Sequence, residues 1–129
     1  FLESLTAIHD SAKAHTHRPR TGATDQTFPN AEHPVIRTHP VTQRKLLFVN
    51  RGFTTKIAGL KRNESDALLE MLFRHVETPE FHCRFKWQKH SVAFWDNRSC
   101  QHQAMFDYWP NRRYAHRVTV AGDKPYYRA

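Results

Sequence analysis

His102, Arg113 and Arg117 are the residues whose types and spacing could support chemistry. On an extended strand, side chains at even separations share a face, so Arg113 and Arg117 would point the same way with a small residue between them. A guanidinium binds a carboxylate through two parallel hydrogen bonds, which makes the pair a candidate anion site. If 102–108 pairs with 113–121, His102 lies beside the same site. Spacing alone favours the plainer alternative of a salt-bridged surface.

The elements that would have to position these residues are strands. Apolar and polar residues alternate over 81–87, and 91–95 is a second strand-like run. The runs 102–108 and 113–121 flank Pro110-Asn111, which predicts a hairpin turn. Several short strands with turns between them indicate a sandwich or barrel of antiparallel strands.

The region before these strands predicts a hairpin and a helix. Strand-like runs at 35–37 and 46–49 flank the polar turn 42–45. The clearest helix spans 64–76, because Leu and Phe residues form one apolar face there. Asn63 is the expected cap of this helix.

The first thirty residues predict a leader rather than part of the sheet. Residues 1–14 have apolar side chains at helical spacing and predict a short amphipathic helix. Residues 15–34 are rich in His, Arg, Thr and Pro and predict a surface loop. The expected organisation is therefore a leader helix and basic loop over 1–30, followed by the main domain over 31–129.

Composition excludes several classes of protein. The formal net charge is +8, but the chain has no block of five or six Lys or Arg, so nucleic-acid binding is disfavoured. No apolar run approaches the length of roughly 18 residues that a membrane span needs. Cys83 and Cys100 lack C-x-x-C spacing, so we expect two free, buried thiols in a reducing, cytoplasmic compartment. Phe1 opens no signal peptide and is no initiator Met, which suggests a chain cut from something longer or an incomplete gene product.

Five separated blocks, in order, resemble the taurine dioxygenase (TauD/TfdA-like) family. They are His33-Pro34-Val35-Ile36-Arg37-Thr38-His39-Pro40; Leu47-Phe48-Val49-Asn50 with Gly52-Phe53-Thr54-Thr55; Trp95-Asp96-Asn97-Arg98 with Gln101-His102; Asp107-Tyr108-x-Pro110 with Arg112-Arg113; and His116-Arg117-Val118-Thr119 with Gly122-Asp123-Lys124-Pro125. The similarity runs from about residue 31 to the end of the chain.

The resemblance implies a mainly β fold with flanking helices, the C-terminal portion of a double-stranded β-helix (jelly roll). Such oxidoreductases hold Fe(II) with two histidines and one carboxylate. They use 2-oxoglutarate as cosubstrate and dioxygen to hydroxylate a small anionic substrate, such as taurine or another sulfonate, releasing succinate and CO2. The resemblance makes His102 the distal iron ligand and Arg113 the 2-oxoglutarate anchor. It places Arg117 at the substrate anion and Phe53 on the substrate pocket, with Trp95 and Asn97 supporting the site.

The family's upstream His-x-Asp ligand motif is absent from this sequence. His75-Val76-Glu77 is the only His-x-Glu, and it lies on a predicted helix too close to His102. This chain would therefore supply one iron ligand of three and should be inactive alone. Its exposed strand edges would require the remaining N-terminal half of the domain or self-association as a homo-oligomer. Two alternatives stay open: a non-catalytic jelly-roll remnant that acts in assembly, and a basic nucleic-acid-binding domain.

Overall fold

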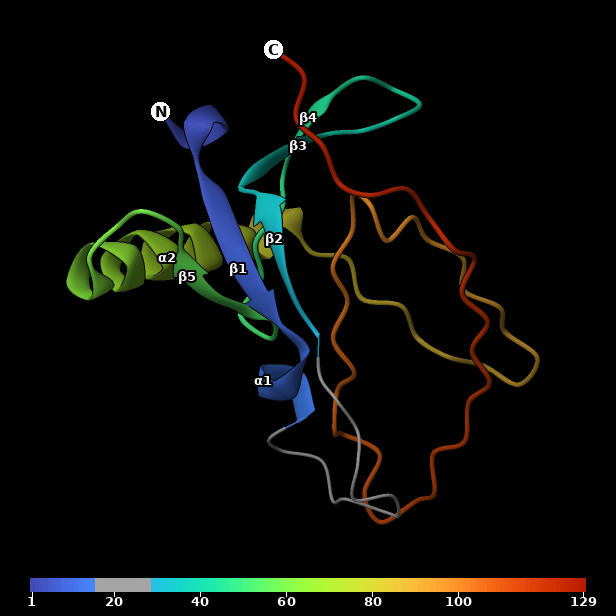
Figure 1. Cartoon of the computed structure of the whole chain (residues 1–129). Coiled ribbons are helices and arrows are strands. Elements are labelled where there is room, and N and C mark those ends of the chain that lie inside the picture. Colours follow the sequence, from blue (N-terminus) through green and yellow to red (C-terminus); the bar gives the residue numbers. More distant parts are fainter. Residues whose placement is uncertain (16–28) are drawn as a thin grey trace.

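The computed structural model describes residues 1–15 and 29–129, and the regular elements of the described chain all lie before residue 82 (Figure 1). Most of the surface loop predicted over 15–34 falls on residues 16–28, outside the described residues. In chain order the elements are the 3-10 helix η1 (Leu2–Ser4), β1 (Thr6–Asp10), α1 (Ser11–His15), β2 (Asn30–Pro34), β3 (Ile36–Thr38), β4 (Lys45–Leu47), β5 (Thr54–Ile57), α2 (Arg62–Val76) and the 3-10 helix η2 (Pro79–Phe81).

The main sheet is antiparallel, with β1 between β2 and β5. Ala7 sits at its centre, opposite His33 of β2 and Ile57 of β5. The amphipathic helix predicted over residues 1–14 is therefore wrong. Pairing on both sides outweighs the local helical pattern, since a central strand satisfies its backbone groups through two neighbours. Helix is confined to η1 and to the short α1 that follows β1.

The predicted hairpin is confirmed. β3 pairs antiparallel with β4, with Ile36 opposite Leu47 and Thr38 opposite Lys45. Its loop covers residues 39–44 rather than 42–45, and Gln43 has a φ of 57° there. The C-terminal tail returns along β3, because Thr38 N–H donates to the carbonyl of Tyr126 at 2.7 Å (Figure 1).

The predicted helix over 64–76 is confirmed as α2, which begins two residues earlier. Its N-cap is Lys61 rather than Asn63. Glu64 reaches back to accept the Lys61 N–H at 2.9 Å, which satisfies a donor that the helix itself leaves free. The acidic residue of the first turn therefore supplies the cap that the sequence pattern assigned to Asn63.

The core forms where α2 packs against the sheet and the hairpin. It consists of Ala7, Val35, Val49, Ile57, Leu69, Leu72 and Phe73. Burying a Leu or Phe side chain contributes about 1.5–3 kcal/mol, so this contact is the main source of stability. The fully buried Ser65 fixes the register of helix on sheet, because its Oγ accepts the Ile57 N–H at 2.8 Å.

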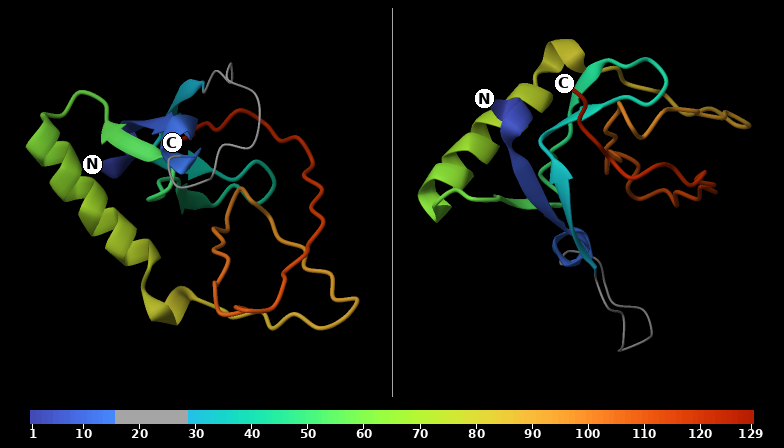
Figure 2. Two further views of the ribbon diagram at one scale, coloured as in Figure 1. Left: turned by 90° about the horizontal axis from the view of Figure 1, so that it is seen from below. Right: turned by 45° about the horizontal axis from the view of Figure 1, so that its top comes forward.

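Residues 82–129 follow an irregular path beside the sheet and contain no strand, so the strands predicted within 81–121 are absent (Figure 2). The alternation over 81–87 does not separate a buried face from an exposed one. Phe85 and Trp87 are 54% exposed, and the polar residues that alternate with the apolar ones are exposed too. A strand needs a neighbour for its backbone hydrogen bonds, and the backbone bonds of these segments in the described chain are local turns only.

Two expectations from composition meet different outcomes. Cys83 and Cys100 are free thiols, as predicted, but both are exposed, so their predicted burial is wrong. Their surroundings belong to the irregular region, which has no apolar interior to enclose them. No helix in the described part of the chain has the length and apolar character that a membrane crossing requires.

Candidate functional site

The four residues predicted to form the site do not come together in the described chain. His102, Arg113 and Arg117 are exposed on the irregular region, and Phe53 is 43% exposed in the turn before β5. No hydrogen bond, ion pair or ring contact among the described residues joins any two of them. Arg113 and Arg117 also lack the shared face that a strand would give them, because 113–121 has no strand neighbour.

His102 nevertheless occupies a defined place. Its ring packs on the indole of Trp95, with 4.8 Å between ring centroids. The Trp95 indole N–H donates to Oδ1 of Asn97 at 2.8 Å, which fixes the indole in turn. Gln101, next in sequence, donates from Nε2 to the carbonyl of Val49 at 2.8 Å and so ties the segment to the end of the hairpin.

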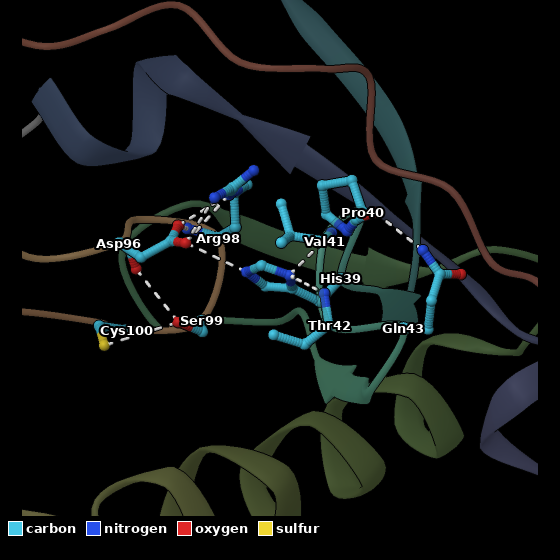
Figure 3. Close-up of polar contacts among 9 residues, drawn as sticks. All are labelled: His39, Pro40, Val41, Thr42, Gln43, Asp96, Arg98, Ser99 and Cys100. Atoms are coloured by element: carbon cyan, nitrogen blue, oxygen red, sulfur yellow. Dashed lines mark hydrogen bonds and ion pairs between the residues drawn. The ribbon is translucent and has the colours of Figure 1, made fainter.

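His39 is the centre of the polar network that carries this segment (Figure 3). It is only 6% exposed and lies in the hairpin loop. Its Nδ1 accepts the backbone N–H groups of Val41 and Thr42 at 3.2 and 3.1 Å. Because Nδ1 is an acceptor, the ring proton lies on Nε2, which donates to Oδ2 of Asp96 at 3.1 Å.

Asp96 links His39 to the loop that precedes His102. Its carboxylate accepts the Arg98 backbone N–H at 2.8 Å and the Arg98 guanidinium through Nη2 at 2.7 Å. Arg98 foremost, with His39, holds the pKa of Asp96 well below its usual range. The loop closes on itself, since the Asp96 carbonyl accepts the N–H groups of Ser99 and Cys100 at 3.1 and 2.9 Å. Sequence spacing could not reveal the His39–Asp96 pair, because 57 residues separate its members.

A second cluster surrounds the ring of Phe48. The His9 ring stacks on it at 5.6 Å, and the His33 ring meets it edge-on at 5.7 Å. The Arg37 guanidinium lies 4.9 Å from its centroid. Arg37 is 2% exposed, and its Nε and Nη2 are buried without a hydrogen-bond partner. Burial first, and then neighbouring cations, lowers the pKa of His33 and of Arg37.

Acid should destabilise the fold through this cluster. Burial, with a smaller contribution from His33, lowers the pKa of His9 from 6.5 to about 4. His9 takes up a proton below about pH 6.5 in the unfolded chain but only below about pH 4 in the folded one. Its contribution to the unfolding free energy is therefore complete above pH 6.5 and is lost as the pH falls toward 4. Because His9 is only partly buried, solvent screens part of this effect, and we expect a loss of about 1 kcal/mol in unfolding free energy between pH 7 and pH 5.

Urea unfolding of the His9→Phe variant at both pH values measures this effect. Phe keeps the stacking on Phe48 but cannot titrate, so the loss on acidification should become smaller, with the remainder due to His33, whose pKa burial also lowers. His82→Gln, at an exposed position, should keep the dependence of the parent. An undiminished loss in His9→Phe would contradict the assignment.

The described residues do not form a complete metal site. No group of three His, Cys, Asp or Glu side chains within residues 1–15 and 29–129 could hold an ion. The rejection of His75-Val76-Glu77 agrees with its contacts: the Glu77 carboxylate is paired with Arg51 at 2.8 Å, and the His75 ring packs on Phe81. The imidazole of His102 suits Fe(II) as one ligand.

Residues 1–119 match the family described as taurine catabolism dioxygenase TauD, TfdA family. An alpha-ketoglutarate-dependent sulfonate dioxygenase of Saccharomyces cerevisiae is 41% identical over 97% of this chain and 31% of its own length. An alpha-ketoglutarate-dependent sulfate ester dioxygenase of Pseudomonas putida is 37% identical over 95% of this chain and 39% of its own length.

A solved structure extends the likeness to the fold. The crystal structure of a taurine dioxygenase from Burkholderia xenovorans matches with a TM-score of 0.63 and 39% identity, over 76% of this chain and 31% of that one. The mainly β fold with flanking helices is thus part of the jelly roll of such dioxygenases. The chain spans about a third of the length of these relatives.

Proposed function

Because this chain belongs to the TauD/TfdA family of dioxygenases, we propose that it forms the C-terminal part of an Fe(II)- and 2-oxoglutarate-dependent enzyme. The longer chain that this implies is called the complete enzyme below. It hydroxylates a small anionic substrate, a sulfonate such as taurine or a sulfate ester, with dioxygen, and it releases succinate and CO2. The match over residues 1–119, with 41% identity to a sulfonate dioxygenase over 97% of this chain, is the observation that carries the proposal.

Each candidate residue takes the role that its chemistry suits. His102 supplies one imidazole to the iron, because a neutral imidazole is a good ligand for this metal. Arg113 binds the far carboxylate of 2-oxoglutarate through its planar fork. Arg117 meets the substrate anion, and Phe53 lines the substrate pocket. The two remaining iron ligands come from outside the described residues, since no three-ligand group exists among them.

The partners follow from the same proposal. The remaining N-terminal half of the domain provides strands for the irregular region. Apolar side chains of this region, such as Val118 at 93%, are exposed. A homo-oligomer is a further expected state. Two free, exposed thiols support a reducing, cytoplasmic location. A non-catalytic jelly-roll remnant is the second candidate, which the incomplete metal site among the described residues favours.

Succinate release by the complete enzyme tests the function. The enzyme is incubated with Fe(II), 2-oxoglutarate and one of three probes: taurine, an alkyl sulfate ester, or a carboxylate of the same chain length. We expect succinate release that depends on 2-oxoglutarate and rises with the sulfonate or the sulfate ester. The carboxylate is the matched control for the anionic group. No succinate with any probe, together with no Fe(II) binding, would support the remnant instead.

A further inference from the structure

We propose that His39 and Gln101 form a two-point anchor that positions His102, so that a buried histidine of the hairpin loop controls metal affinity without touching the metal. This inference rests on the proposed function, because it takes His102 as an iron ligand. It adds to that function two positioning residues, neither of which belongs to the predicted site.

The first anchor lies at the start of the segment that carries His102. The Nε2–H of His39 donates to Asp96 at 3.1 Å (Figure 3), and Asp96 adjoins the Trp95 whose indole packs on His102. His39 itself cannot turn away, because Nδ1 holds two backbone N–H groups of the hairpin loop and its side chain is buried. A rigid donor therefore fixes the base of the segment.

The second anchor lies at its far end. Gln101 donates from Nε2 to the carbonyl of Val49, which is fully buried in the core. Between the anchors, two further hydrogen bonds hold the segment together. The Arg98 guanidinium donates to the Asp96 carboxylate, and the Cys100 N–H donates to the Asp96 carbonyl. One end is thus fixed to the β3–β4 hairpin loop and the other to Val49, two residues after β4, although the segment has no regular secondary structure.

This arrangement answers a physical requirement of the proposed ligand. An imidazole on an irregular, exposed segment loses conformational freedom when it binds a metal, and that loss weakens the affinity. Anchoring the segment in advance removes part of this cost. Residues that orient a metal ligand typically change metal affinity by about 10- to 100-fold when they are replaced.

Two conservative replacements of His39 separate positioning of His102 from support of the hairpin loop. The amide nitrogen of Gln falls near the place of Nε2 and can still donate to Asp96. The amide oxygen of Asn falls near Nδ1 and can still accept the N–H groups of Val41 and Thr42. The experiment measures the dissociation constant of the complete enzyme for Co(II), a non-reactive stand-in for Fe(II), together with its melting temperature.

We expect His39→Asn to weaken Co(II) binding by about tenfold or more, and His39→Gln to stay within about threefold of the parent. Thr42→Val, in the same loop but exposed, is the control and should bind as the parent does. The opposite order, with Asn restoring affinity and Gln losing it, would mean that His39 only supports the loop. Equal affinity in both variants would also overturn the proposal.

Gln101→Leu tests the second anchor at an exposed position, where misfolding is not expected. We expect the Co(II) dissociation constant to rise by about tenfold while the KM for 2-oxoglutarate at saturating metal is unchanged. A rise in that KM alone, or unchanged metal binding, would overturn the two-point anchor. His102→Ala keeps the two proposals distinguishable: if it alone abolishes Co(II) binding, the ligand assignment stands and only the anchor fails.

Discussion

Replacing His102 with Ala in the complete enzyme should abolish succinate release that depends on 2-oxoglutarate. Loss of one ligand of three removes a metal bond, which matters more than the loss of a residue that merely orients a ligand. Because the latter costs about 10- to 100-fold, we expect more than about 100-fold in metal affinity and in turnover. Succinate release at saturating 2-oxoglutarate and the Co(II) dissociation constant measure the two effects.

The structure supplies the reason to expect little loss of stability in this variant. His102 is exposed and its ring packs on that of Trp95, so the replacement leaves no buried cavity. His116→Ala is the matched control, since His116 is also exposed and packs on an aromatic ring, that of Tyr114. We expect melting temperatures close to that of the parent for both variants. Undiminished succinate release in His102→Ala would overturn the ligand assignment.

Local patterns predicted the elements that local interactions build. The hairpin of β3 and β4 and the helix α2 follow from alternation and from an apolar face. The predicted helix cap, Asn63, lies two residues after the observed one. Lysine is not a residue type that predicts a cap, and at Lys61 the capping hydrogen bond is accepted by the side chain of Glu64. Such an error moves an element boundary without changing the packing.

The wrong predictions concern elements whose state depends on distant partners. β1 has a helical pattern but becomes a strand, because β2 and β5 occupy both of its edges. Residues 81–87 have a strand pattern but form no strand: Phe81 ends the 3-10 helix η2, and 83–87 stay irregular because no neighbouring strand accepts their backbone hydrogen bonds. Periodicity reports which residues could share a face, and only tertiary pairing decides whether that face exists.

The candidate site divides in the same way. The residue types at His102 and Arg113 could be selected from the sequence by resemblance, and they stay predictions. The His39–Asp96 bond could not, because it joins two loops 57 residues apart. The hydrogen bond from Gln101 to the carbonyl of the buried Val49 could not be predicted either. It depends on where the irregular segment passes the end of the hairpin.

Arg113→Lys in the complete enzyme should raise the KM for 2-oxoglutarate with little change in kcat. Lysine keeps the charge but replaces a planar fork by a point donor, so one of two parallel hydrogen bonds to the carboxylate is lost. A hydrogen bond to a charged group contributes about 1.5–3 kcal/mol, which corresponds to about a 10- to 100-fold rise in KM. Steady-state rates of succinate release over a range of 2-oxoglutarate concentrations measure it.

Neighbouring arginines separate this anchor from general positive charge. Arg112→Lys is the matched control, because Arg112 is adjacent and equally exposed yet has no proposed ligand. Its KM for 2-oxoglutarate should equal that of the parent. Arg117→Lys should instead raise the KM for the sulfonate, because a different anion lies against it in the proposal. If Arg113→Lys and Arg112→Lys gave the same KM, the charge of the segment rather than the fork of Arg113 would attract the cosubstrate, and the anchor would have to be sought elsewhere.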